Sequence, residues 1–194
     1  MFIGGRQPQV SMATAKTGSF YLTETVVIPA GSADGTVVQG EIDLGAYVNV
    51  ATSQAIAIEQ VDFVFQGGST FSPFYQAIAS ADSAFSVQLS DLNPGTKNLR
   101  ADNQSLIASG GLNIDRTANL ATMTSDLYPD NFGGTALSEA FMVVNDSLYL
   151  TSGVFGAVSG AADVSVTARI KCRVAKLGNK DWMAIAIQST ASDN

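Results

Sequence analysis

Few side chains in this sequence are equipped for catalysis. The 194-residue chain has no histidine, which removes the commonest general base and the commonest metal ligand. Ser-His-Asp catalysis is therefore excluded, and no phosphate-binding or nucleophile-elbow motif is present. A two-carboxylate glycosidase needs only Asp or Glu, and the candidates are Glu41, Asp43, Glu59 and Asp62. All four lie in predicted strands, where carboxylates mark a solvent face or a subunit contact, so we expect a protein that is not an enzyme.

The single cysteine, Cys172, can form neither an intramolecular disulfide nor a zinc site. It alternates with Ile170 and Val174, which is typical of a small buried hydrophobic side chain. A reactive thiol is the alternative interpretation.

Calcium is the ion that the sequence favours most. Asp126, Asp130 and Asn131 place oxygen ligands in a turn, as hard cations prefer, and the segment 91–93 (DLN) is similar. Neither segment matches an EF-hand loop, and Asp and Asn are also ordinary turn formers. We therefore expect no cofactor, with calcium at Asp126, Asp130 and Asn131 as the alternative.

The scarce cations gather on one short stretch, 166–176 (VTARIKCRVAK). Its four basic residues, Arg169, Lys171, Arg173 and Lys176, are candidates for contact with a partner. Three interpretations stay open: an acidic protein neighbour, lipid phosphates, or a solvated strand face whose charges prevent edge-to-edge aggregation.

A long strand must position this stretch. Over 163–174, apolar and polar residues alternate strictly, which predicts a strand with one face on a core and Arg169, Lys171 and Arg173 on the outer face. Gly178-Asn179 then predicts a tight turn, and the apolar run 182–187 predicts a second strand. We expect the two strands to form a C-terminal hairpin.

Further strands follow the same pattern. In 55–65 the apolar parity changes near Glu59-Gln60, which predicts a β-bulge. With turn signals between strands and no βαβ rhythm, the sequence predicts an all-β, single-domain, eight-stranded antiparallel β-sandwich of jelly-roll type. We expect the domain over 19–188, an N-terminal arm over 1–18 and a C-terminal tail over 189–194. The other strands are predicted at 19–28, 36–44 and 84–89, with weaker candidates at 104–108, 119–124 and 141–150, so that the sequence has eight or nine strand candidates in all.

Charge and composition favour an assembly. The net charge is −7, charged residues make up 14% and hydrophobic residues 46% of the chain. A weakly charged surface is usually covered in an oligomer, and an acidic balance gives no strong nucleic-acid signal. The first residues lack the basic and apolar regions of a signal peptide, and no window of the sequence predicts a transmembrane segment.

The strand order and the terminal segment DVSVTARIKCRVAKLGNKDWMAIAI resemble the single jelly-roll coat proteins of icosahedral viruses. The resemblance implies a structural capsid protein of the virion that assembles with copies of itself, and with other capsid proteins. Arg6 and Lys16 are the only basic residues among the first eighteen, so a basic arm that packages a genome is not expected. A shell that surrounds an inner membrane fits the net negative charge of the chain better than a shell that binds its genome directly. The alternative is a non-catalytic binding module: a carbohydrate-binding sandwich, or a phage head or tail decoration protein.

Overall fold

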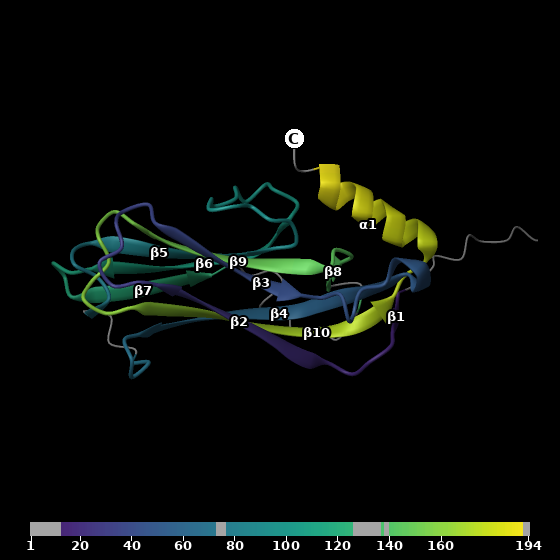
Figure 1. Ribbon diagram of the computed structural model, residues 1–194, viewed down its shortest axis with the longest axis horizontal. Helices are drawn as coiled ribbons and strands as arrows, with labels where there is room; N and C mark the ends of the chain where they lie inside the picture. The colour runs from purple at the N-terminus through teal and green to yellow at the C-terminus, as the bar shows by residue number, and fades with distance from the viewer. Residues whose placement is uncertain (1–12, 73–76, 126–136, 138–139, 192–194) are drawn as a thin grey trace, which may run out of the picture.

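The computed structural model describes residues 13–72, 77–125, 137 and 140–191. These residues form an all-β sandwich of two five-stranded antiparallel sheets with a helix at one end (Figure 1). The first sheet contains β1 (Thr14–Ala15), β2 (Phe20–Ile28), β10 (Val164–Lys176), β4 (Gln54–Gly67) and β8 (Phe141–Val143). The second sheet contains β3 (Val37–Asp43), β9 (Ser147–Phe155), β5 (Ser83–Ser90), β6 (Leu106–Asp115) and β7 (Leu120–Ser125).

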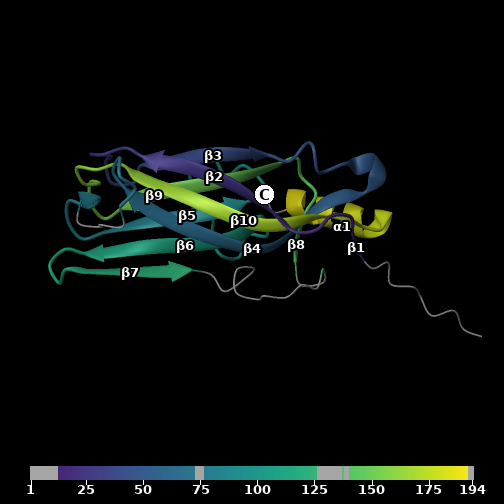
Figure 2. The ribbon, with the colours of Figure 1, turned by 90° about the horizontal axis from the view of Figure 1, so that it is seen from below.

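The strand pairs are nested like a folded ribbon. β5 pairs with β6, β4 with β8, β3 with β9, and β2 with β10, so that each pair encloses the one before it. Two further pairings, β10 with β4 and β9 with β5, join the ribbon to itself and complete the sheets. β7 extends the edge of the second sheet beside β6, as Figure 2 shows.

The inward faces of the two sheets form one hydrophobic core. Period-two alternation in β10 buries Ile170 and Cys172 completely, as the sequence predicts. The other fully buried large side chains include Ile56 and Ile58 of β4, Phe85 of β5 and Leu150 of β9.

The predicted β-bulge in β4 is confirmed. Lys171 of β10 pairs with Gln60, but the next residue, Cys172, pairs with Ile58, so Glu59 is the extra residue. The bulge lets the apolar residues on either side of Glu59 face the same core despite their different parity.

The predicted C-terminal hairpin is wrong. Residues Asn179–Ala191 form a helix, α1, in place of a strand over 182–187. Trp182, Ile185 and Ala186 pack together against a small cluster of Ala55, Val144 and Leu177, and their spacing of three and four residues is helical. An apolar run of this length fits a buried strand or a helix equally well, and Asp181 in the first turn favours the helix. Among the described residues, no helix is long and apolar enough to cross a membrane.

The described residues contain ten strands, whereas eight were expected. The predicted strand 141–150 is two strands in different sheets, β8 and β9, because the chain crosses from one sheet to the other at residues 144–146. The two-residue β1 also falls within 1–18, the predicted arm, and pairs with the end of β10. The domain boundaries stay predictions.

Candidate functional site

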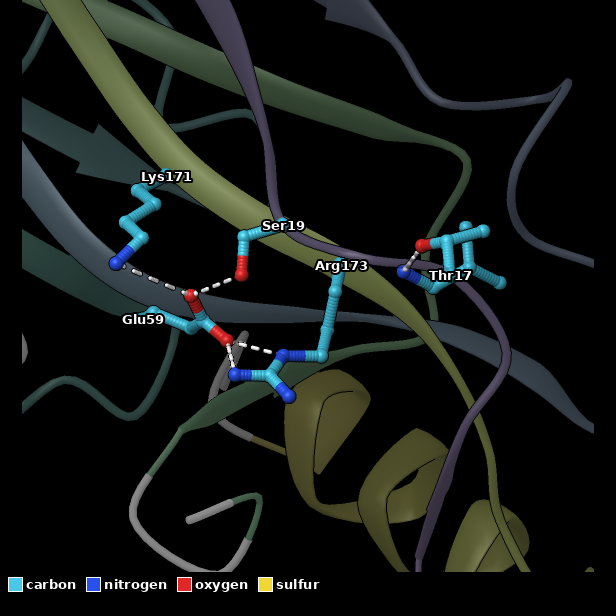
Figure 3. A network of polar contacts seen from close by, with 6 residues as sticks. Thr17, Ser19, Glu59, Lys171 and Arg173 are labelled. Atoms are coloured by element: carbon cyan, nitrogen blue, oxygen red, sulfur yellow. Dashed lines mark hydrogen bonds and ion pairs between the residues drawn. The ribbon is translucent and has the colours of Figure 1, made fainter. Parts of the chain in front are cut away.

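The bulge holds a cluster of charged groups on the outer face of the first sheet (Figure 3). The side chain of Glu59 is only 5% exposed. The Arg173 guanidinium donates to Glu59 Oε1 through both Nε and Nη2, and Lys171 Nζ lies 3.7 Å from Oε2. The Ser19 hydroxyl donates to Oε2 at 2.8 Å. A buried carboxylate is stable only with such partners, so these residues act as one unit.

The segment before β2 is fastened to the same cluster. The backbone N–H of Lys16 donates to the carbonyl of Val174 at 2.8 Å, and the N–H of Val174 donates to Thr17 Oγ1 at 3.0 Å. Lys16 Nζ donates to Gln54 Oε1 at 2.7 Å. Together with Ser19, these contacts hold the chain along the end of β10 (Figure 3).

The four predicted partner-contact cations differ in their surroundings. Arg169 and Lys176 are exposed, and Lys171 is half-buried. Arg173 lies on the outer face as predicted, but its side chain is only 16% exposed because it pairs with Glu59. Treating it as a solvent-exposed cation is therefore wrong. Arg169 lies opposite Asp62 in the register of β10 and β4.

The four carboxylates considered for catalysis each have a local contact. Glu41 accepts a hydrogen bond from the Ser147 hydroxyl, Asp43 from the backbone N–H of Gly45, and Asp62 from the Gln60 amide. The carboxylate of Glu59 is shared among Arg173, Lys171 and Ser19. These contacts indicate a structural role for the four side chains within the sheets.

Cys172 is completely buried beside the bulge. Burial, together with the negative charge of Glu59, raises the pKa of its thiol to about 12. A protonated, inaccessible thiol is a poor nucleophile, which favours the interpretation of Cys172 as a core residue.

The calcium candidates Asp126, Asp130 and Asn131 lie outside the described residues. Within the described part of the chain, no group of three or more His, Cys, Asp or Glu side chains could hold a metal ion.

Two adjoining grooves lie on the outer face of the second sheet. The first has a volume of about 410 Å³, and its polar lining comes from Ser86, Gln88, Ser109, Asn113 and Thr124. The second has a volume of about 440 Å³ and adds the ring of Phe155, and Ala84 and Asn113 line both grooves. Sequence reasoning missed these grooves because they depend on which strands are neighbours. The only sequence signal for the grooves was the succession of small polar residues in 83–90 and 105–113.

Beside the first groove, a loop folds over the same sheet. Gln88 and Leu99 exchange two hydrogen bonds, of 2.9 Å and 2.7 Å, between the Gln88 side-chain amide and the Leu99 backbone. The Gln39 amide donates to the carbonyl of Gly95 at 3.0 Å. The loop is consequently fixed by side chains of β3 and β5.

Comparison with known proteins provides little information about the function of this chain. No family model matches the chain, and no curated protein matches it. A chain from the solved structure of Desmodium yellow mottle tymovirus can be superposed on this one. The alignment covers 90% of this chain and 98% of the tymovirus chain, with 10% sequence identity and a TM-score of 0.32. A likeness at this level is no basis for assigning a function.

Proposed function

We propose that this chain is a structural capsid protein that assembles with copies of itself into an icosahedral viral shell. The supporting observation is the nested pairing of eight strands. If β1 and β7 are set aside and the others are numbered along the chain, the sheet orders are 1-8-3-6 and 2-7-4-5. This order supports a jelly roll, in which a long antiparallel ribbon wraps around a core. Jelly rolls occur in viral capsids, lectins and cupins, and cupin chemistry normally needs histidine, which this chain lacks.

The surface supports a role in an assembly. Several large apolar side chains are at least half exposed, and charged residues make up only 14% of the chain. Leu120 and Met123 are exposed on β7, which is the edge strand of the second sheet among the described residues, and Met183 and Ile187 are exposed on α1. Unpaired edges and exposed apolar groups favour association, so contact with further copies is the role that these positions suit.

The charge distribution favours a shell that does not bind its genome through a basic surface. In the cation stretch, Arg173 and Lys171 both form ion pairs with Glu59 of the same chain. Arg169 and Lys176 are the stretch's exposed cations, and they suit an acidic neighbour in the shell or the phosphates of an inner membrane. In this proposal the protein is non-catalytic and is located in the virion.

Electron microscopy and sedimentation of the purified chain test the proposal. We expect shells or capsomers, and we expect replacement of Leu120 and Met123 by serine to weaken assembly while leaving the melting temperature within a few degrees. Val50→Ser is the matched control, because Val50 is 67% exposed but lies away from β7, in a short 3-10 helix. A chain that stays monomeric at high concentration across salt and pH would overturn the proposal.

The grooves on the second sheet favour one other function, a carbohydrate-binding module. Hydroxyl and amide groups with an aromatic ring at one end are suitable for a sugar. Trp182 is not available as a sugar platform, because it lies in α1 and packs against the cluster of Ala55, Val144 and Leu177. Binding on a glycan array that disappears in Asn113→Ala, but persists in the exposed control Thr25→Ala, would favour this function over the shell.

A further inference from the structure

The outward face of α1 is apolar although it is exposed. Trp182, Ile185 and Ala186 lie on the face that packs against the end of the sandwich. Met183 and Ile187 are four positions apart, so they are neighbours on the helix, and they are 60% and 64% exposed. Beyond its first turn the helix contains no charged residue. A surface helix normally carries charged side chains on its solvent face, so this face indicates contact with an apolar partner.

Lysines lie on and beside this face. Lys180 precedes Met183 by three positions and Ile187 by seven, so its exposed side chain is on the same face of the helix. The exposed Lys176 ends β10, just before α1 begins. β1 pairs with the end of β10, which brings the exposed Lys16 to the same end of the sandwich. Three of the chain's five lysines therefore lie at this end, which we term the α1 end.

The opposite end of the sandwich is acidic. The register of β4 and β10 places Gln54 and Lys176 at the α1 end and Gly67 and Val164 at the other end, and Figures 1 and 2 show α1 at one end of these strands. The loops at the other end, which we term the acidic end, hold four exposed aspartates, each of which accepts a backbone hydrogen bond of 2.7 to 2.9 Å. An anionic surface would attract the α1 end and repel the acidic end, and would therefore orient the molecule. The four aspartates are Asp34, Asp82, Asp115 and Asp163.

An anionic lipid surface fits these features better than a second copy of the chain. Two copies that met through α1 around a two-fold axis would bring their lysines together, and Asp181 is the only carboxylate of each helix that could offset the repulsion. Anionic headgroups attract Lys176 and Lys180, and the acyl chains beneath them accept Met183 and Ile187. Such a combination of basic and apolar side chains is typical of helices that bind at a membrane interface.

We propose that α1 binds the surface of an anionic lipid bilayer, with Met183 and Ile187 in the boundary between headgroups and acyl chains, Lys176 and Lys180 at the headgroup phosphates, and the acidic end directed away from the membrane. The inference deepens the proposed function and rests on it for the source of the lipid, because an inner membrane beneath the shell would supply the bilayer. β7, which contains no lysine, stays available for contact with further copies.

Vesicles of phosphatidylcholine and phosphatidylglycerol in equal parts test the proposal with the full chain. Flotation over a range of lipid concentrations measures binding. Trp182, the only tryptophan of the chain, lies in α1 and reports its position through fluorescence quenching by lipids with brominated acyl chains. We expect binding with quenching, and weaker binding in raised salt or on pure phosphatidylcholine.

Combined replacement of Met183 and Ile187 by glutamate should weaken vesicle binding at least about tenfold, because it places carboxylates against the bilayer. Both positions are exposed, so the melting temperature should stay within a few degrees. Val158→Glu is the matched control, because Val158 is an exposed apolar residue in a loop at the acidic end, and it should bind as the unchanged protein does. Combined replacement of Lys176 and Lys180 by serine should weaken binding and reduce its salt dependence.

The absence of vesicle binding would overturn the proposal, as would binding without quenching of Trp182 or equal binding of the double glutamate variant. If the face contacts another copy instead, that variant should lose self-association in lipid-free buffer and the unchanged protein should not bind vesicles. Shells that form without lipid and ignore vesicles would refute this inference alone. A monomer that binds vesicles through α1 would contradict the shell and leave the lipid contact intact.

Discussion

Glu59 occupies the bulge of β4, and its buried carboxylate forms an ion pair with Arg173 of β10. The pair joins the two central strands of the first sheet on the face opposite the core. Because Ser19 also donates to Glu59, the pair fixes the chain that leads into β2 as well. Its loss should affect the whole fold, whereas the loss of an exposed cation should not.

Arg173→Ser should lower the free energy of unfolding by about 3 kcal/mol, because the buried Glu59 carboxylate loses its closest cationic partner and keeps only Ser19 and the more distant Lys171. Arg169→Ser, at an exposed position of the same face, should change it by less than about 1 kcal/mol. Urea unfolding of both variants measures the difference. Equal effects of the two substitutions would mean that Arg173 and Glu59 do not form a buried pair in solution.

Asp91 should make stability depend on pH. Burial raises the pKa of its carboxyl from 3.8 to about 6, although hydrogen bonds from the backbone and Asn145 act in the opposite direction. The folded state therefore binds the proton more tightly than the unfolded state. The resulting stability is fully present below about pH 3.8 and is lost as the pH rises through about 6.

Asp91→Asn removes this dependence. A shift of roughly two units at about 1.4 kcal/mol each predicts a variant that is up to about 3 kcal/mol more stable at pH 7.5. The advantage should shrink steadily down to pH 4.5. Urea unfolding at pH 4.5, 6 and 7.5 measures the difference between the two proteins, and a constant difference would contradict the assignment to Asp91.

The helical form of α1 predicts which side chains support it. Ile185 packs against the cluster around Ala55 and Val144, whereas Ile187 is 64% exposed. Ile185→Ser should therefore cost about 2 kcal/mol, and Ile187→Ser less than about 0.5 kcal/mol. In a strand the two residues would share one face and respond alike, so thermal unfolding of the pair distinguishes the two structures.

Cys172 should be unreactive in the folded protein. Burial keeps its thiol inaccessible and raises the pKa to about 12, so a thiol reagent at pH 7.5 should label it only after unfolding. The fraction labelled over time, with and without urea, provides the measurement. Rapid labelling of the folded chain would show that β10 opens locally.

Local patterns in the sequence predict the parts of the fold that depend on one strand. The alternation of 163–174 predicts the buried face of β10, and the parity change in 55–65 predicts the bulge. The pairing of Glu59 with Arg173 could not be predicted, because it requires that β4 and β10 are neighbours although the two residues are 114 positions apart in the sequence. α1 was missed for a different reason. The run 182–187 is apolar at both parities, and only the positions of Trp182, Ile185 and Ala186 on a packed surface separate a helix from a strand.

The nested pairing also governs how the chain can fold. Thr25 of β2 and Thr167 of β10 are adjacent in the sheet and their hydroxyls lie 2.8 Å apart, yet 142 positions separate them along the chain. To bring such distant residues together, the chain between them must lose loop-closure entropy, and strand pairing compensates for this loss only after the contact has formed. Folding should therefore take milliseconds to seconds. During synthesis, β2 cannot pair until β10 and all the residues between the two strands have left the ribosome. The first sheet is thus completed only after β10 has been synthesised, and any surface that requires both strands forms later than one built on the second sheet's β5 and β6.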